Sequence, residues 1–280
     1  MKQNKTNLIL IAVFLLGLAL LVYPSVSNYW NSFHATRAIA SYAEQVAELD
    51  NTHYRQLWQE AEAYNQTLAG KSNRWVLSDE ERAQYEALLD VSGTGIIGYV
   101  EIPEIRVSLP IYHGVDEAVL QIAAGHIEGS SLPVGGTGTH CVLSGHRGLP
   151  SARLFTDLDQ LTEGDVFMLR VLDEVLTYEI DQIHIVEPQE LQDLELVPGQ
   201  DYCTLVTCTP YGINSHRLLV RGHRIANANE DDIRVTADAL TIEPLLVAPV
   251  VAAPILLVLL VIVLLGTRKK PDRTDKAERL

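Results

Sequence analysis

Two long apolar runs lie near the ends of the chain. Residues 8–23 are all apolar, and Lys2 and Lys5 precede them. Residues 245–265 hold no charged side chain and precede a basic tail. About 20 apolar residues in a helix cross a bilayer, so the second run predicts a membrane-spanning helix. The first run predicts an uncleaved anchor, which we favour, or the core of a signal peptide cleaved near Ser25-Val26-Ser27.

Basic residues stand on the terminal side of both runs. Lysine and arginine concentrate on the cytoplasmic side of membrane spans, so we expect both termini in the cytoplasm. Residues 24–243 are then expected to lie outside the cell.

The part that follows the first run has a helical pattern. Over residues 35–69, apolar side chains recur at spacings of three and four. Asp50-Asn51-Thr52 interrupts this pattern and is expected to cap a second helix, which Gly70 would end. Residues 78–81, Ser-Asp-Glu-Glu, fit a capping box that opens a short third helix through Leu89.

The pattern changes after Gly95. Short runs rich in β-branched and apolar residues follow, separated by Gly, Pro, Asn and Asp. The expected strands are residues 96–102, 107–112, 140–143, 166–171, 175–185, 203–207 and 218–224, with short helical pieces at 117–124 and 152–161. Seven or eight short strands over about 130 residues predict a mainly β fold, a closed or nearly closed barrel.

The charge of the chain narrows the function classes. Residues 8–267 carry 13 Lys and Arg against 33 Asp and Glu, a net charge of −20. Such a surface repels phosphate backbones, which argues against nucleic-acid binding. It suits a cationic partner, for example a substrate that presents lysine, although an acidic solvated surface is the commoner explanation.

Cys141, Cys203 and Cys208 are the three cysteines. They are too few for a disulfide scaffold, and at least one has no intramolecular partner. Cys203 and Cys208 are expected on opposite faces of one strand, and Cys141 is expected to pack in the barrel. The chain has neither Cys-x-x-Cys nor His-Glu-x-x-His, so we expect no metal site and no cofactor.

Cys208 ends an expected strand, where a side chain can face a cleft. On this ground alone, a small buried hydrophobic role would be the commoner outcome. His146 follows another expected strand and Gly145, and Arg217 opens the next β run nine residues after Cys208. A turn through residues 211–215 would bring Arg217 beside Cys208 on an antiparallel strand.

Residues 204–208, Thr-Leu-Val-Thr-Cys, resemble the TLxTC signature of sortases. With His146 and Arg217, Cys208 is similar to the Cys-His-Arg set of that family. Residues 95–105, 109–114, 125–136, 139–161 and 204–222 resemble the class C, or pilus-assembling, sortases of Gram-positive bacteria. The resemblance covers about residues 40–225, and it implies an eight-stranded β-barrel on the outer side of the cell membrane.

The resemblance implies a cysteine transpeptidase. Cys208 as thiolate would attack a backbone carbonyl, His146 would transfer protons, and Arg217 would stabilise the oxyanion or hold the substrate. The implied partners are pilin subunits, with an LPxTG-like sorting signal cleaved between Thr and Gly and an acceptor lysine. Thr207 and Ser144 are expected to contact the substrate.

Class C sortases carry a lid whose Asp-Pro-aromatic segment plugs the active site. The corresponding residues here are Asn73, Arg74 and Trp75, so only the aromatic residue is retained. Asn73 cannot form a charged pair with Arg217, and the loss of Pro loosens the backbone. We expect Trp75 to cover Cys208 in a resting state that opens readily; the alternative is that Trp75 packs on the barrel rim.

Other notable residues have plainer interpretations. His140 and His216 are expected to be packing or surface residues, and Arg147 to be structural or adjacent to substrate. Gly135-Gly136-Thr137-Gly138 is not followed by Lys-Ser/Thr and predicts a loop rather than a phosphate site.

The expected organisation has six parts. They are a cytoplasmic tail with the N-terminal anchor or signal segment (1–34), a helical region with the lid (35–94), the barrel (95–228), an acidic tether (229–243), a transmembrane helix (244–267) and a basic cytoplasmic tail (268–280). The lid region and the second span favour a pilin polymerase. Two alternatives are a cell-wall-anchoring sortase with a peptidoglycan amine as acceptor, and a non-catalytic membrane-tethered binding module, against which the Cys-His-Arg set argues.

Overall fold

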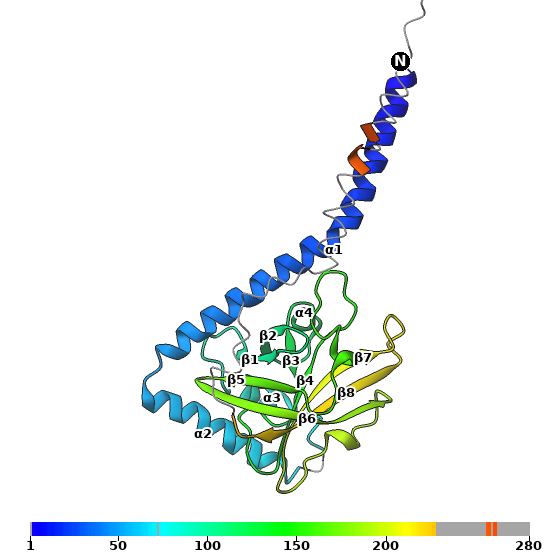
Figure 1. Ribbon diagram of the computed structural model, residues 1–280. Coiled ribbons are helices and arrows are strands. Elements are labelled where there is room, and N and C mark those ends of the chain that lie inside the picture. Colours follow the sequence, from blue (N-terminus) through cyan, green and yellow to red (C-terminus); the bar gives the residue numbers. More distant parts are fainter. Residues whose placement is uncertain (1, 72, 228–255, 259, 262–280) are drawn as a thin grey trace, which may run out of the picture. The chain divides into compact units, whose positions relative to one another are not determined.

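The computed structural model describes residues 2–71, 73–227, 256–258 and 260–261 (Figure 1). The chain divides into two compact units, residues 1–27 with 237–280, and residues 28–236. The predicted tether, the basic tail and nearly all of the predicted second span lie outside the described residues.

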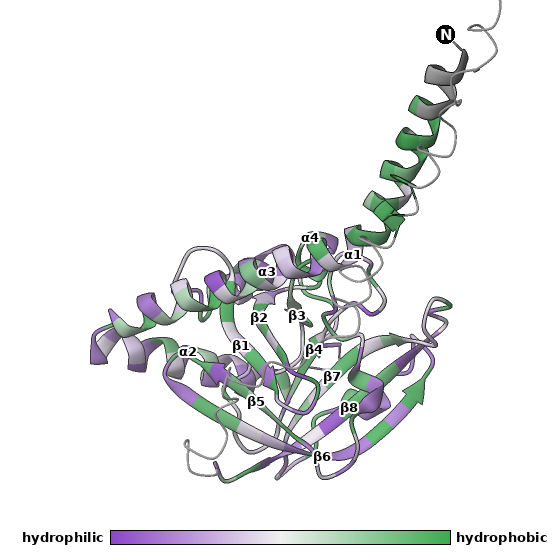
Figure 2. Ribbon diagram, turned by 45° about the horizontal axis from the view of Figure 1, so that its top comes forward, coloured by the Kyte–Doolittle hydropathy of each residue, from purple (hydrophilic) through white to green (hydrophobic). Residues whose placement is uncertain are grey.

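One described helix is long and apolar enough to cross a membrane. It is the stretch from Leu8 to Ala47 of α1 (Lys2–Ala47), next to the N-terminus. Its apolar side chains are largely uncovered, and Leu8, Leu16 and Leu20 are 63–68% exposed. Figure 2 shows the half of the α1 ribbon nearer the N-terminus in nearly continuous green, the colour of hydrophobic residues. The first apolar run and the start of the helical segment expected from residue 35 are therefore parts of one continuous helix, α1.

The helical part of the second unit contains the two predicted caps. The Asp50 side chain accepts hydrogen bonds from the backbone N–H groups of Thr52 and His53 and opens α2 (Asn51–Leu68). Ser78 and Glu81 form the reciprocal capping box of α3 (Asp79–Glu86). Both predictions are confirmed, because cap residues satisfy backbone donors at a helix start by purely local contacts.

The strands form a closed barrel in the order β1-β2-β3-β4-β7-β8-β6-β5. Their bounds are β1 (Ile96–Ile102), β2 (Val107–His113), β3 (Ala124–His126), β4 (Thr139–Ser144), β5 (Val166–Val171), β6 (Glu174–Val186), β7 (Asp201–Thr209) and β8 (His216–Ile225). The β2–β3 and β4–β7 pairs are parallel, and the other neighbours are antiparallel. The predicted eight-stranded barrel is confirmed.

Two expected helical pieces are wrong in extent. Residues 117–124 contain only α4 (Glu117–Leu120), and their end belongs to β3. Residues 152–161 contain only a 3-10 turn, η1 (Leu158–Gln160), and the remaining η2 (Gln192–Leu194) is of the same kind. Tertiary contacts override the helical pattern here, because the Phe155 N–H donates to the His146 carbonyl rather than within a helix.

The sheet formed by β4, β7 and β8 is apolar on both faces. Leu143, Leu205 and Val220 belong to the main core inside the barrel. On the other face, the four buried residues Val142, Leu194, Val206 and Leu219 form a second, smaller apolar group, which we call the outer cluster. The expected lid residue Trp75 packs against this outer cluster.

Candidate active site

Cys208 and Arg217 face each other on neighbouring strands. The two strands, β7 and β8, are antiparallel, and Cys208 pairs directly with Arg217 in their register. Directly opposed residues have Cβ atoms about 4.5–5.5 Å apart, so the two side chains share one end of the barrel. Cys208 is a free, partly exposed thiol, whereas Cys141 and Cys203 are free and buried. The predicted strand pairing is confirmed.

His146 is brought to the same end of the barrel by β4. Because β4 and β7 are parallel and in register, both end at the same edge. Two hydrogen bonds tie Gly145, the residue before His146, to β7. The Gly145 N–H donates to the Val206 carbonyl at 3.0 Å, and the Thr207 hydroxyl donates to the Gly145 carbonyl at 2.8 Å. The backbone beside His146 is thus fixed to the residues that precede Cys208.

Close packing explains why a glycine stands before His146. A Cβ atom at Gly145 would lie 2.6 Å from the Phe155 ring, which is fully buried in the core. The ring holds the end of β4 against the barrel, and only a residue without a side chain fits between them.

Glu117 gives the site a negative charge. Its Oε2 atom lies 3.5 Å from His146 Nε2, and its side chain is 73% exposed. A hydrogen bond from Gln121 and, to a lesser extent, the charge of His146 lower the pKa of Glu117. Glu117 could not be singled out from the sequence, since an exposed carboxylate at a short helix carries no signal until its partner is known.

Arg147 has a fixed set of partners beside the site. It forms an ion pair with Asp159, and its guanidinium lies 3.5 Å from the Thr209 hydroxyl. It also lies 5.9 Å from the centre of the Tyr211 ring, in the turn after Cys208. These contacts agree with the expected structural or substrate-adjacent role.

Thr207 joins β7 to the segment that follows β4. It is buried, and its hydroxyl donates a hydrogen bond to the Gly145 carbonyl. Its expected contact with substrate stays a prediction. Ser144 is partly exposed at the last position of β4, paired with Gly125 and Val206, and its substrate contact stays a prediction.

The expected lid segment is anchored by Arg74. The guanidinium of this buried residue donates to the carbonyls of Gly129 at 3.0 Å and Leu194 at 2.7 Å. It also pairs with Glu195 at 3.3 Å and lies 4.1 Å from the centre of the Trp75 ring. These contacts argue against a loosely held segment, because Arg74 supplies fixation that the missing Asp and Pro do not.

Trp75 lies on the face of the sheet that carries Cys208. It packs in the outer cluster with Val206, and Val206 and Cys208 share one face because they are two residues apart on β7. The buried His140 also has partners on this side, since its ring nitrogens lie 2.7 Å from the Thr204 hydroxyl and 3.0 Å from the Glu195 carbonyl. His216 is exposed, so both histidines agree with the expected packing and surface roles.

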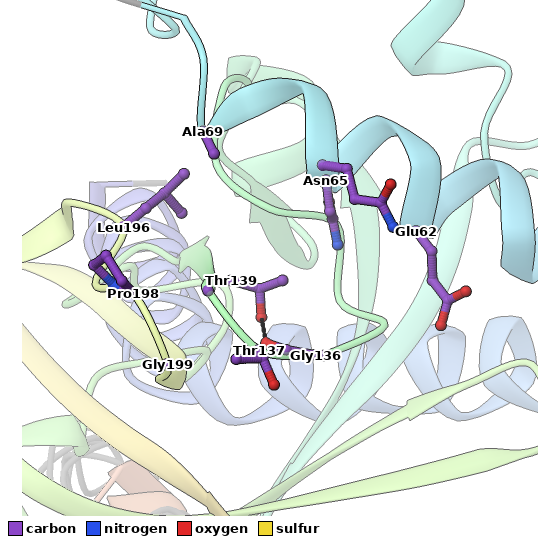
Figure 3. A pocket seen from close by; sticks show the side chains of 12 residues that line it. Glu62, Asn65, Ala69, Gly136, Thr137, Thr139, Leu196, Pro198 and Gly199 are labelled. Carbon is purple, nitrogen blue, oxygen red and sulfur yellow. Dashed lines mark hydrogen bonds between the residues drawn. The ribbon is translucent and has the colours of Figure 1, made fainter.

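A separate hollow lies at the opposite ends of β4 and β7 (Figure 3). It is a cavity of about 680 Å³ between the end of α2, the loop of residues 135–138 and the loop of residues 196–199. Thr139 and Asp201, which pair at the starts of these strands, stand at this end. At ~3.3 Å per residue, Cys208 is ~23 Å further along β7, so this cavity is not part of the candidate site.

Comparison with known proteins agrees with this arrangement. The sortase domain family matches residues 100–225. Sortase A of Streptococcus agalactiae serotype III (strain NEM316) is 32% identical over 117 residues, which cover 41% of this chain and 47% of that protein. Sortase D of Bacillus subtilis (strain 168) is 31% identical over 131 residues, 46% of this chain and 63% of that protein. The chain thus spans about half to two thirds of the length of these curated relatives.

Solved structures resemble the chain more fully. Sortase C1 from Streptococcus agalactiae is 50% identical with a TM-score of 0.66, and the match covers 69% of this chain and 100% of that one. Sortase C from Streptococcus pneumoniae is 44% identical with a TM-score of 0.61, covering 69% and 98%. Sortase C-1 from Actinomyces oris is 43% identical with a TM-score of 0.58, covering 62% and 98%. The chain belongs to the sortase family, and these structural neighbours are class C sortases.

Proposed function

We propose that this sortase is a cysteine transpeptidase that joins pilin subunits. It cleaves an LPxTG-like sorting signal between Thr and Gly and transfers the acyl group to a lysine of another subunit. The observation that carries this proposal is the direct pairing of Cys208 with Arg217, with His146 tied to the same rim through Gly145. The similar sortase C from Streptococcus pneumoniae, described in terms of pilin substrate specificity, supports the choice of substrate.

In the first step, the Cys208 thiolate attacks the carbonyl carbon of the scissile Thr-Gly bond. A carbon–sulfur bond forms, the carbon–nitrogen bond breaks, and His146 gives its proton to the departing glycine amine. Arg217 donates hydrogen bonds to the carbonyl oxygen as it gains negative charge. Guanidinium suits this role because it stays protonated throughout.

In the second step, the lysine amine attacks the thioester. The amide bond forms, the carbon–sulfur bond breaks, and neutral His146 takes the proton that the amine releases. The Cys208 thiolate and the His146 imidazolium are thereby restored. The thioester keeps the acyl group activated after the peptide bond is cleaved, so the formation of the new amide bond needs no cofactor.

The same proposal includes an arrangement in the membrane. The apolar helix near the N-terminus supports an anchor. We place the barrel, residues 95–228, outside the cell membrane of a Gram-positive bacterium, with both termini in the cytoplasm and a second span at residues 244–267. Protease digestion of intact cells that carry tags at each end tests this topology, since neither tag should be removed.

The experiment that tests the function uses the full chain in detergent micelles with purified pilin subunits. Wild type should produce a ladder of covalent multimers on a denaturing gel, and Cys208→Ala should not. A pilin whose acceptor lysine is replaced by Arg should give the thioacyl-enzyme but no ladder.

Two outcomes would contradict the proposal. If no thioacyl-enzyme forms with an LPxTG peptide under reducing conditions, the transpeptidase is excluded and a binding module becomes the better interpretation. Transfer to peptidoglycan amines alone would identify a wall-anchoring sortase.

A further inference from the structure

The ion pair between Glu117 and His146 joins a carboxylate, which is ionised at neutral pH, to a histidine that changes its charge during the proposed reaction. The Glu117 carboxylate is 73% exposed and lies 3.5 Å from His146 Nε2. It is placed by α4, which begins just after Asp116, and it also accepts a hydrogen bond from Gln121. The carboxylate therefore stands in solvent at the edge of the candidate site, next to the group that moves protons in the proposed reaction.

Another carboxylate beside the site has a different kind of partner. Asp159 pairs with Arg147, whose guanidinium stays charged at every step. The counter-ion of Glu117, by contrast, is charged only while His146 is protonated. Of these two carboxylates, only Glu117 loses its counter-ion during the reaction.

The loss occurs at a defined moment. When His146 gives its proton to the departing amine, its ring becomes neutral and Glu117 is left as an uncompensated carboxylate beside the thioester. The next molecule to enter carries a lysine side chain, which is an ammonium ion at neutral pH because its ordinary pKa is about 10.4. The site thus gains an unpaired negative charge when a cation has to be bound.

We infer that Glu117 binds the ammonium group of the acceptor lysine and makes this sortase selective for charged amines over water. This inference rests on the proposed transpeptidase function. The ammonium pairs with Glu117, which holds it beside neutral His146 and the thioester, and it gives one proton to solvent to become a free amine. The amine attacks the thioester, the amide bond forms and the carbon–sulfur bond breaks. His146 takes the second proton from the attacking nitrogen, Cys208 leaves as thiolate, and the new imidazolium pairs again with Glu117, so that charge and protons balance.

The test compares two acceptors that differ in charge. The full chain in micelles is acylated with an LPxTG peptide and offered Nα-acetyl-lysine amide together with hydroxylamine, which is largely uncharged at neutral pH. The ratio of lysine conjugate to hydroxamate is measured by mass spectrometry. Because both products come from one thioacyl-enzyme, the ratio is independent of the rate of acylation.

Glu117→Gln should lower this ratio roughly fivefold, the effect of one exposed ion pair. Glu117→Asp, which keeps the charge on a shorter side chain, should restore part of it. Asp116→Asn is the matched control, because it removes the same charge from the neighbouring residue. The Asp116 carboxylate forms no ion pair with the described residues of the site and makes no side-chain hydrogen bond to cap α4. Its ratio should equal that of wild type.

Three results separate the possible failures. An unchanged ratio in Glu117→Gln overturns the inference while leaving the transpeptidase intact. An equal fall in Glu117→Gln and Asp116→Asn also overturns it, since the effect is then one of overall charge. The absence of hydroxamate with wild type instead removes the proposed function itself, because no thioacyl-enzyme has formed.

Discussion

The Thr207 hydroxyl donates a hydrogen bond of 2.8 Å to the carbonyl of Gly145 and so joins the strand that carries Cys208 to the segment that carries His146. Both groups are buried, and the bond spans 62 residues of sequence. The relative position of the proposed nucleophile and the proposed acid therefore depends on a buried contact within the protein.

Removing this hydroxyl should impair catalysis more than peptide binding. In Thr207→Val the buried Gly145 carbonyl loses its donor, which costs about 1–3 kcal/mol of unfolding free energy. We expect kcat for peptide cleavage to fall at least roughly tenfold, with little change in KM, because misplacement of a catalytic group acts on the chemical step. Steady-state kinetics and thermal unfolding measure the two effects.

Thr204→Val is the matched control for Thr207→Val. Thr204 is also buried on β7, and its hydroxyl bonds to His140 rather than to the His146 segment. Thr204→Val should destabilise the fold to a similar degree as Thr207→Val, with a much smaller loss of kcat. Thr207→Ser should recover most of the activity, and a wild-type kcat in Thr207→Val would contradict the positioning role.

Adding one methyl group at Gly145 should destabilise the same region. The new Cβ would meet the buried Phe155 ring at 2.6 Å, and overpacking of this kind costs about 1–3 kcal/mol. Gly145→Ala should lower the melting temperature and the rate of thioacyl-enzyme formation, and Phe155→Leu in the same chain should recover part of both. Gly70→Ala is the control, since its nearest neighbour lies 4.0 Å away and no change in melting temperature is expected.

Local sequence patterns predicted the parts of the site that depend on neighbours in sequence. A short turn connects β7 to β8, so the pairing of Cys208 with Arg217 could be predicted from the sequence. β3 was not, because three residues, Ala124–His126, are too few to show a strand period. Its parallel pairing with β2 and the closure of the barrel by β4 beside β7 are tertiary facts.

The outer cluster and Glu117 were missed for related reasons. The apolar runs around Val142 and Val206 are typical of strands that are buried on both faces. The sequence does not show which element covers the second face. The partner of Glu117 is 29 residues further along the chain, so their pairing exists only in the folded protein. The contacts of Arg74 were missed for the same reason, because the two carbonyls that it reaches lie 55 and 120 residues further along the chain.

The anchored lid segment should control access to Cys208. Arg74→Ala removes the donor to two buried carbonyls and Trp75→Ala removes the ring that packs against the outer cluster, so both should accelerate labelling of Cys208 by a thiol reagent, roughly severalfold or more. Native wild type should react at one thiol, and Cys208→Ala at none, since the other two cysteines are buried.

Arg82→Ala is the matched control for the labelling experiment. It breaks a partly exposed ion pair with Glu128 close to the same segment, and such pairs contribute little. Its labelling rate should match that of wild type. If Arg74→Ala and Trp75→Ala also leave the rate unchanged, the segment does not cover Cys208 and Trp75 only packs on the rim.

Stability should fall between neutral and mildly acidic pH because of a buried histidine. Burial lowers the pKa of His140 to about 4, whereas an unfolded histidine titrates near 6.5. Between these values the unfolded chain binds the proton and the folded chain does not. The contribution of neutral His140 to the free energy of unfolding is therefore complete above about pH 6.5 and is lost progressively as the pH falls toward 4. Urea unfolding at pH 7.5, 6 and 5 measures this slope. In His140→Gln the protein should be less stable at pH 7.5, since the hydrogen bonds to the Thr204 hydroxyl and the Glu195 carbonyl change, but its stability should fall less steeply with acid. An equal slope in both proteins would mean that His140 does not contribute to the acid sensitivity.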